Sequence, residues 1–367
     1  MEIEKGKISS SQLILLLAGF VQGSALTVTF AVNIAKQDTW LVVVSGTVLA
    51  FALVWIYLKL SLMYPGKNLI QINELVYGSF LGKFVSVVYI YWLMSLIPQH
   101  LRYIGDFFLS YFMPETPMWV ILTLFTFLCI WATREGIEVI ARTSFILVMI
   151  TVITTIIIFC LSLKNMKLTN FLPLFELTRR DFIQGTNIIL TITYCDLLAF
   201  LMVIPYVNRL KEVKKSIFWG LLLGAITIST VTFNFIAVLG TIATIMTSPF
   251  LEAVRLIDIG KVFTRMEMLV TMALSITVFL KISVLLYATV LSLAQLFRLQ
   301  SYLPLSFPVG IICISLTILL FDSTMDQFDW GPNIWPINAL PFMVLLPTLS
   351  LFIAKIRKMS RKRKGEY

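Results

Sequence analysis

The stretch Gln12–Ala35 reads QLILLLAGFVQGSALTVTFAVNIA and contains no charged residue. A bilayer core is crossed by roughly 20 consecutive apolar residues, so this run is long enough to span a membrane. Its middle, Gln22–Ala25 (QGSA), is polar or small and predicts an interruption of the helix. Lys5 and Lys7 precede the run, which is too long for a signal-peptide core and lacks a convincing small-residue cleavage site. We therefore expect a retained but broken spanning helix at 10–35.

The rest of the chain is equally apolar. Of its 367 residues, 59% are apolar and 13% are charged, and the mean hydropathy is +0.92. Such a composition cannot build a water-facing surface around one core. Because unsatisfied backbone groups cannot face lipid, long apolar runs bounded by charge, Pro or Gly are interpreted as helices. The predicted spans are 10–35, 40–62, 82–112, 118–132, 141–163, 184–206, 216–241, 266–298, 303–321 and 335–355. They predict an all-α polytopic membrane protein with about ten transmembrane helices and a single transmembrane domain over 1–367.

A second interruption, Thr193–Asp196 (TYCD), falls in the sixth predicted span, five helices after the first. Many secondary transporters consist of two inverted five-helix repeats whose first helices unwind near the bilayer midplane. There, exposed N–H groups face an anionic substrate group and carbonyl groups face a cation. For either interruption alone, close packing of small residues is the competing explanation. The matching positions favour a 5+5 inverted-repeat, transporter-like fold with interrupted helices 1 and 6.

Lys and Arg residues divide unequally between the two sides of this predicted bundle. Nineteen lie on the side of both termini, seven of them in Lys355–Lys364, and eight lie on the opposite side. Because cytoplasmic loops retain positive charge, the short N-terminus 1–9 and the basic tail 356–367 are both predicted to be cytoplasmic. The net charge of +10 indicates contact with an anionic lipid bilayer rather than with nucleic acid, since the basic residues lie between and after the apolar runs.

The sequence lacks the common signatures of enzymes and metal sites. Its four cysteines have no CxxC spacing, and HExxH, Walker-type and GxSxG motifs are absent. We therefore expect no cofactor, no metal and no catalytic residue. The single histidine, His100, is either the base of an intramembrane acyltransferase or hydrolase, or part of an interfacial kink at Pro98. No second catalytic group is recognisable near it, which favours the kink.

Lys281 lies in the middle of the eighth predicted span, where a charge costs at least about 2.5–3.5 kcal/mol on insertion scales. It either replaces a bound cation beside the break in helix 1, or forms a static salt bridge to Asp196 or to helix C-terminal carbonyl groups. The functional role is favoured, with Asp196 as the most attractive partner. Ser283 and Tyr287, four residues apart, either offer a hydroxyl group and an aromatic wall to a small ligand or serve packing alone.

Two local features are predicted to be structural. Arg102 and Asp106 have the spacing of an ion pair within one helix. In the connection 244–265, Ser248 is expected to cap a short amphipathic helix that starts with Pro249.

Six stretches together, in this order, resemble the B subunit family of bacterial spore germinant receptors, which is itself similar to the amino acid/polyamine/organocation transporters. They are Tyr64–Glu74 (YPGKNLIQINE), Pro114–Val120 (PETPMWV), Gly136–Arg142 (GIEVIAR), Leu201–Asn208 (LMVIPYVN), Phe250–Ile257 (FLEAVRLI) and Lys281–Ala288 (KISVLLYA). Their combination covers roughly residues 8 to 320.

The resemblance implies a membrane subunit that senses a germinant, commonly an amino acid, beside an A subunit and a C lipoprotein in the spore inner membrane. It also implies a ligand pocket between the breaks of helices 1 and 6, with walls from helices 3 and 8. Carried onto this sequence, the ligand-binding positions are Gly23, Ser24, Ala25, Tyr91, Ser95, Tyr194, Asp196, Leu197, Ser283 and Tyr287, with Lys281 as the buried charge.

We predict a germinant-sensing subunit in which a ligand stabilises one arrangement of the bundle. The alternative is a proton-coupled amino acid permease, because fold alone does not separate a sensor from a transporter. A gene flanked by a large A-type membrane subunit and a lipoprotein would favour the receptor. An isolated gene beside metabolic genes would favour the permease.

Overall fold

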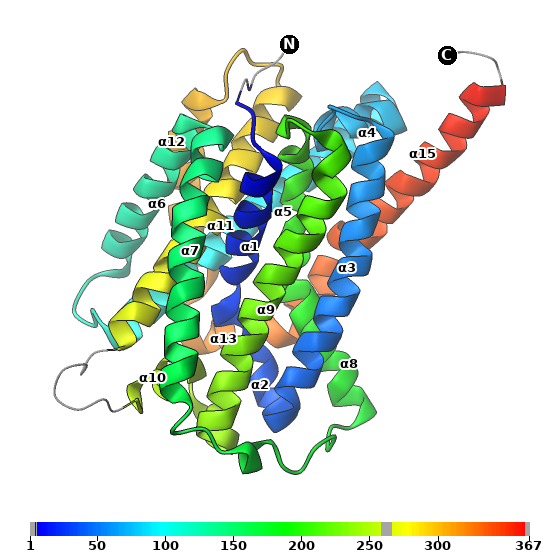
Figure 1. Ribbon diagram of the computed structural model, residues 1–367. Helices are drawn as coiled ribbons and strands as arrows, with labels where there is room; N and C mark the ends of the chain where they lie inside the picture. Colours follow the sequence, from blue (N-terminus) through cyan, green and yellow to red (C-terminus); the bar gives the residue numbers. More distant parts are fainter. Residues whose placement is uncertain (1–3, 5, 258–265, 364–367) are drawn as a thin grey trace.

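The molecule is a bundle of long helices. The computed structural model describes Glu4 and residues 6–257 and 266–363. In this part of the chain, the only β-type pairing is a single bridge between Ile8 and Val207. The start of α1 (Ser10–Gln22) and the end of α15 (Leu346–Arg363) lie at the same end of the bundle (Figure 1), as expected for an even number of spans.

The predicted spans correspond to observed helices throughout. Among the described residues, nine segments are long and apolar enough to cross a membrane, and the apolar α1 is shorter because helix 1 is broken. In chain order the spanning units are α1 with α2 (Thr29–Ala35), α3 (Thr39–Met63), α5 (Ser79–Tyr111), α6 (Met118–Glu135), α7 (Ile137–Ser162), α8 (Arg179–Ile188) with its continuation to Tyr206, α9 (Val213–Leu239), α11 (Glu267–Leu296), α12 (Ser306–Leu320), and α14 (Trp335–Leu340) with α15. The ten-span helical fold with interruptions in helices 1 and 6 is confirmed.

Helix 1 begins and breaks where its sequence changes character. Ser9 accepts a hydrogen bond from the Gln12 backbone, and the Gln12 side chain accepts one from the Ser9 backbone, which caps the start of α1. The α-helix ends before Gly23. Ala25–Val28 then winds as a tighter 3-10 turn before α2 begins. The predicted interruption therefore lies at the predicted residues.

Helix 6 is broken over a longer stretch. α8 widens into a π turn at Ile189–Thr193, and beyond Tyr194 the chain winds as a 3-10 helix over Cys195–Met202. Such turns are uncommon and often occur at functional sites. Arg179–Met202 is also the most buried of the candidate spans found in the described residues, so this break lies inside the bundle rather than at its lipid face.

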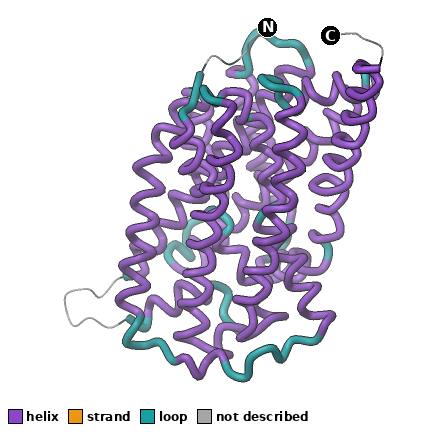
Figure 2. Tube along the Cα trace, turned by 45° about the vertical axis from the view of Figure 1, so that its right-hand side comes forward, coloured by secondary structure: helices purple, strands orange, loops and turns teal. Residues whose placement is uncertain are grey.

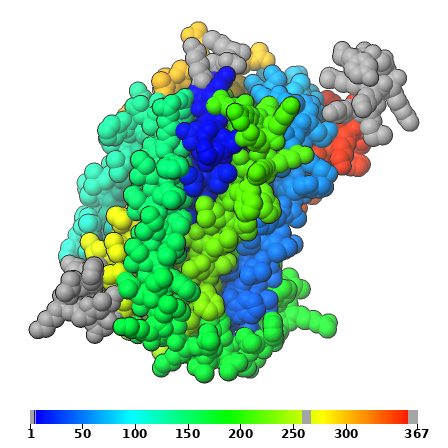
Figure 3. Space-filling view, viewed as in Figure 1, coloured from blue at the N-terminus to red at the C-terminus, as the bar shows by residue number. Residues whose placement is uncertain are grey.

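Small residues bring α1 and α9 into close contact. A Cβ atom added at Gly220 would lie 2.7 Å from the Ile14 carbonyl oxygen, and one added at Gly224 would lie 2.7 Å from Val21 Cβ. The small-xxx-small spacing of these glycines permits this approach. In the space-filling view, α1 (dark blue) is visible between α7 and α9 (Figure 3).

Short helices lie outside the spans, and Figure 2 shows loop segments gathered mainly at the two ends of the bundle. α10 (Pro249–Arg255) begins at the predicted residue, but the Ser248 side chain makes no capping hydrogen bond, so that predicted cap is wrong. α4 (Leu69–Tyr77) and α13 (Thr324–Asn333) are not predicted by span length, although each begins with a capping box.

The predicted ion pair in α5 is present and has a structural role. Arg102 Nε lies 2.9 Å from Asp106 Oδ2, and both side chains are buried. Arg102 Nη1 also donates to the Phe321 carbonyl oxygen at 2.7 Å, which ties α5 to the end of α12.

Candidate functional site

The breaks of helices 1 and 6 touch each other in the interior of the bundle. Ser24 Oγ donates a hydrogen bond to the Thr193 carbonyl oxygen at 2.9 Å. Gly23 lies directly against α11, because a Cβ atom there would be 2.7 Å from the Thr277 carbonyl oxygen and 2.9 Å from Lys281 Cβ. A residue without a side chain is therefore required for the break of helix 1 to reach α11.

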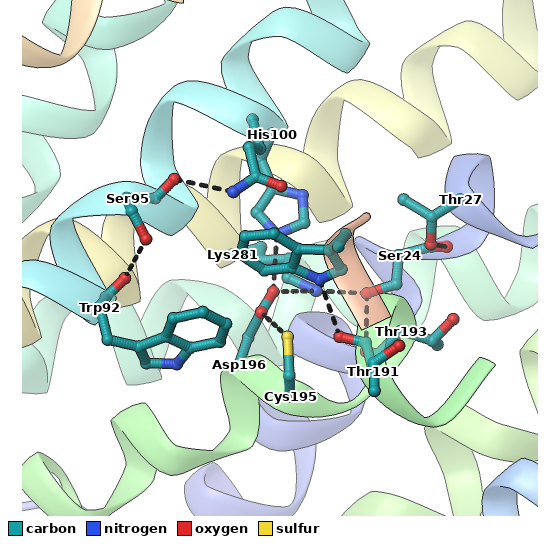
Figure 4. A network of polar contacts seen from close by, with 12 residues as sticks. Ser24, Thr27, Trp92, Ser95, His100, Thr191, Thr193, Cys195, Asp196 and Lys281 are labelled. Atoms are coloured by element: carbon teal, nitrogen blue, oxygen red, sulfur yellow. Dashed lines mark hydrogen bonds and ion pairs between the residues drawn. The ribbon is translucent and has the colours of Figure 1, made fainter. Parts of the chain in front are cut away.

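Lys281 of α11 lies where the two breaks meet and is fully buried. Its Nζ is 2.8 Å from Asp196 Oδ2, and it also donates a hydrogen bond to Ser24 Oγ. The same ammonium group lies 5.0 Å from the centre of the Phe20 ring, within range of a cation–π contact. Figure 4 shows Lys281 between Asp196 and Ser24. One cation thus joins both helix breaks to α11, and the predicted contact with Asp196 is present.

His100 belongs to the same group of charges. Its Nε2 lies 2.6 Å from Asp196 Oδ2, and its side chain is buried. The interpretation of His100 as part of an interfacial kink is wrong, because α5 continues as a helix through Pro98 and carries the imidazole into the centre of the bundle. A signal was present in the sequence: His100 stands near the middle of the predicted span 82–112.

Asp196 has a partner on each carboxylate oxygen. Oδ1 accepts from Cys195 Sγ, and Oδ2 faces Lys281 and His100. Burial of an isolated charge costs several kcal/mol, which an opposite charge and hydrogen bonds offset. Such a pair adds little net stability, yet removal of one partner typically costs about 3–5 kcal/mol. We call Ser24, His100, Asp196 and Lys281 the break cluster.

The remaining predicted residues of the two breaks lie around the cluster. Ala25 begins the 3-10 turn after Ser24. Tyr194 is buried, but its hydroxyl group pairs with Thr47 Oγ1 of α3 at 2.8 Å rather than with the cluster. Leu197 is buried and lines a small apolar space that Leu17 and Tyr57 also line.

The structure does not bring Tyr91 to the cluster. The Tyr91 side chain is 67% exposed at the outer face of α5 and lies beside Phe342, whereas the next residue, Trp92, is buried. Consecutive helical residues point about 100° apart, so the two side chains face different surroundings. Ser95 is half-buried, and its hydroxyl group donates to the Trp92 carbonyl oxygen at 2.8 Å.

Ser283 and Tyr287 also lie away from the cluster. They follow Lys281 by two and six residues, which turns them to another side of α11. There the Ser283 carbonyl oxygen accepts a hydrogen bond from Thr133 of α6 at 3.4 Å, and the Tyr287 ring packs edge-on against Tyr302 at 5.6 Å. Both side chains are buried. These contacts do not decide between the two alternatives, and a ligand-binding role for Ser283 and Tyr287 stays a prediction.

A small pocket opens beyond the cluster on the side opposite the termini. Tyr103 separates it from His100, with the two rings 5.9 Å apart and edge-on. Phe30 lies 5.6 Å from Tyr103 and 5.1 Å from Phe328 of α13, measured between ring centres. The pocket has a volume of about 40 Å³, which admits water but not an amino acid. The structure is therefore closed at this position, with Tyr103 between His100 and a pocket that is too small for an amino acid.

Comparisons with known proteins agree on one family of sequences. The family model described as "Spore germination protein" matches residues 7–325. Spore germination protein KB of Bacillus subtilis is 27% identical over 374 residues, covering 99% of this chain and 98% of that protein. Spore germination protein YndE of the same organism is 26% identical, covering 97% and 98% respectively.

Two solved structures with a similar arrangement of helices are transporters. A nucleobase-cation-symport-1 family transporter in a closed conformation, with bromovinylhydantoin bound, matches with a TM-score of 0.69 at 12% identity, covering 94% of this chain and 78% of that one. A Na⁺-coupled sialic acid symporter in a substrate-bound, outward-open state matches with a TM-score of 0.65 at 15% identity, covering 92% and 78%. At these identities the likeness shows the fold, and the predicted transporter-like fold is confirmed.

Proposed function

Because the chain belongs to the spore germination protein family, whose model matches residues 7–325, we propose that it is the membrane subunit of a spore germinant receptor. In this role it binds a small germinant, such as an amino acid, and triggers germination of the spore. The family and its structural relatives are receptors or transporters, so the activity is binding and conformational change rather than covalent catalysis. The observation that carries the proposal is the Lys281–Asp196 pair held between the two helix breaks.

An α-amino acid carries the two charges that this pair recognises. Its carboxylate group matches the Lys281 ammonium group, and its ammonium group matches the Asp196 carboxylate and the carbonyl groups of the unwound segments. A ligand in this position competes for the contacts that hold the breaks together. It shifts the bundle only if it binds the open and closed arrangements with different affinity, and that difference is the signal.

Lys281 has a second consequence for the proposed site. In transporters with broken helices, the carbonyl groups of an unwound segment coordinate a cation. Here the Lys281 ammonium group supplies a fixed positive charge beside the break of helix 1, hydrogen-bonded to Ser24 and paired with Asp196. We propose that this side chain takes the place of a bound cation, so that ligand binding does not depend on sodium.

Equilibrium binding tests the proposal. The purified chain in lipid nanodiscs is titrated with radiolabelled amino acids, one at a time, with and without sodium. We expect one class of amino acid to bind, and Asp196→Asn to weaken its binding by about 10–100-fold, the loss expected for one hydrogen bond to a charged group. Asp322→Asn, a change at an exposed carboxylate, is the matched control. Equal binding by wild type and Asp196→Asn would exclude the cluster as the site.

The partners and the location are proposed from the family. An A subunit and a C lipoprotein complete the receptor, in the spore inner membrane, and transmit the change in the bundle. Both described ends of the chain lie at one end of the bundle (Figure 1), and the excess of Lys and Arg on that side supports cytoplasmic termini. Co-purification of the two subunits with this chain from spores tests the assembly.

A proton-coupled amino acid permease is the second candidate. The buried contact between His100 and Asp196 favours it, because proton-coupled transport needs titratable groups within the membrane. The fold of the two symporters fits either function. Uptake of the bound amino acid into liposomes, driven by a pH gradient, distinguishes a permease from a receptor that binds without transport.

A further inference from the structure

A groove between α3 and α9 faces outward from the bundle. It has a volume of about 640 Å³, which lies within the range of ligand-binding pockets. Both helices belong to membrane-spanning segments and lie side by side in Figures 1 and 3, so the groove opens to lipid rather than to water. All of its lining residues are uncharged, and they include Val44, Val48 and Phe51 of α3, Ala225 and Ile226 of α9, and Phe159 of α7.

The walls of the groove indicate what fills it. Val48 is 62% exposed and Ile226 is 54% exposed, so apolar surface is available at the mouth. The two threonine hydroxyl groups in the lining are already bonded within the protein: Thr47 Oγ1 to the Val43 carbonyl oxygen at 2.8 Å, and Thr230 Oγ1 to the Ile226 carbonyl oxygen at 2.9 Å. Apart from the Ser229 hydroxyl group and the unpaired Trp40 Nε1 at one end, water or a polar head group would find few partners here. An empty groove would forfeit dispersion contacts, which a flexible alkyl chain restores.

We propose that this groove binds one acyl chain of a membrane phospholipid. Lipid tails are as apolar as leucine, so the selectivity of the site comes from packing and shape rather than from the hydrophobic effect. Trp40, the second residue of α3, lines the groove at its end opposite the termini. Tryptophan rings at the ends of spanning helices lie at the level of the head groups. The ester end of the chain therefore lies near Trp40, and its methyl end lies toward Phe51.

The base of the groove is connected to the break of helix 6. Thr47 lines the groove, and its Oγ1 is 2.8 Å from the Tyr194 hydroxyl group. The adjacent Gly46 packs so closely on the π turn that a Cβ atom there would lie 2.5 Å from Ile189 Cγ2. A chain in the groove thus contacts Thr47, which in turn holds Tyr194, two residues before Asp196. Together with the proposed germinant site, this makes acyl-chain occupancy a regulator of the break.

Native mass spectrometry of the purified chain, released from phosphatidylglycerol bilayers without added germinant, tests the binding. We expect one phospholipid to remain bound. Ala225→Phe fills the groove from the buried side of α9. Ser229→Leu adds a smaller side chain to the same groove and replaces the first variant if that variant folds poorly. Each should lower the bound lipid at least tenfold. Leu319→Phe, which enlarges a side chain that is 78% exposed on α12, should leave it unchanged. Equal retention by all variants, or a free fatty acid in place of the phospholipid, would overturn the proposal.

Hydrogen exchange tests the connection to helix 6 without any germination assay. The peptide that covers Ile189–Met202 should exchange more slowly in the lipid-loaded chain than in the delipidated chain, by at least threefold. Thr47→Val retains the apolar wall and removes the hydroxyl contact with Tyr194. It should keep the lipid and abolish that difference. An unchanged difference in Thr47→Val would overturn the connection. Because neither experiment contains a germinant, failure here leaves the proposed receptor function untouched.

Discussion

Replacement of Lys281 by methionine removes the positive charge of the break cluster while keeping an apolar side chain of similar length. Asp196 then loses its 2.8 Å ion pair and keeps His100 and Cys195, and Ser24 loses the donor on its hydroxyl group. Removal of one partner of a buried ion pair costs about 3–5 kcal/mol of folding stability. Because Asp196 keeps its contacts with His100 and Cys195, we expect a loss near the lower limit, about 3 kcal/mol. At about 1.4 kcal/mol per factor of ten, this loss lowers the ratio of folded to unfolded chain about 100-fold.

Thermal unfolding in detergent, with a double-mutant cycle, measures this effect. We expect Lys281→Met to insert normally into membranes but to unfold several degrees below wild type. Lys281→Met combined with Asp196→Asn removes both charges and should recover most of the loss, with a coupling energy of about 2–3 kcal/mol. Arg142→Met is the control, because its i,i+4 pair with Glu138 is exposed and contributes about 0–1 kcal/mol.

The same variant tests the functional role of Lys281. A looser cluster changes the germinant concentration at which spores respond, because less binding energy is needed to separate the breaks. Spores carrying Lys281→Met are scored over a germinant titration at several pH values. A normally expressed variant that unfolds and responds like wild type at every pH would refute the reasoning.

Three further changes have defined outcomes. Gly23→Ala places a Cβ atom 2.7 Å from a carbonyl oxygen of α11 and should weaken amino acid binding at least tenfold in the nanodisc assay, with unchanged expression. Gly224→Val forces α1 and α9 apart and should destabilise the chain by about 1–3 kcal/mol in thermal unfolding. Tyr302→Phe removes the 3.0 Å hydrogen bond to Glu4 that holds the N-terminal segment against the bundle. Loss of about 1 kcal/mol of that segment's stability should speed tryptic cleavage after Lys7 about fivefold. Burial raises the pKa of the Tyr302 hydroxyl group, and the nearby Glu4 carboxylate raises it further. The hydroxyl group therefore keeps its proton and donates to Glu4 at neutral pH, and this hydrogen bond is lost only as alkaline pH removes the proton.

The sequence predicts the bundle well because membrane crossing imposes a length and a composition on each span. The predicted span 40–62 is observed as Thr39–Met63, and 118–132 as Met118–Glu135. The two interruptions are predicted by polar and small residues at matching places in the two halves. α4 and α13 are missed because they are too short to carry the span signal.

The site is predicted less completely because contacts between distant helices leave no local pattern. Lys281 and Asp196 are identified since a charge in a span needs a partner, and they do pair. His100 is set aside because no second catalytic group is recognisable near it, whereas its partner Asp196 lies 96 residues further along the chain. Tyr91 is chosen for its residue type, whereas the helix turns it outward and places Trp92 inside. Hydrophobic periodicity does not correct this choice, since both the lipid face and the interior are apolar.

Two paired measurements distinguish a germinant receptor from a permease. Spores that lack this chain are scored for germination against a panel of amino acids, sugars and nucleosides. The purified chain in liposomes is tested for uptake of the same compounds. If the chain is a receptor subunit, the spores lose their response to one germinant class, commonly an amino acid, and the purified chain binds that compound without transporting it. Transport of the compound by the chain, together with unchanged germination of the deletion spores, would exclude the receptor role and make the protein a permease.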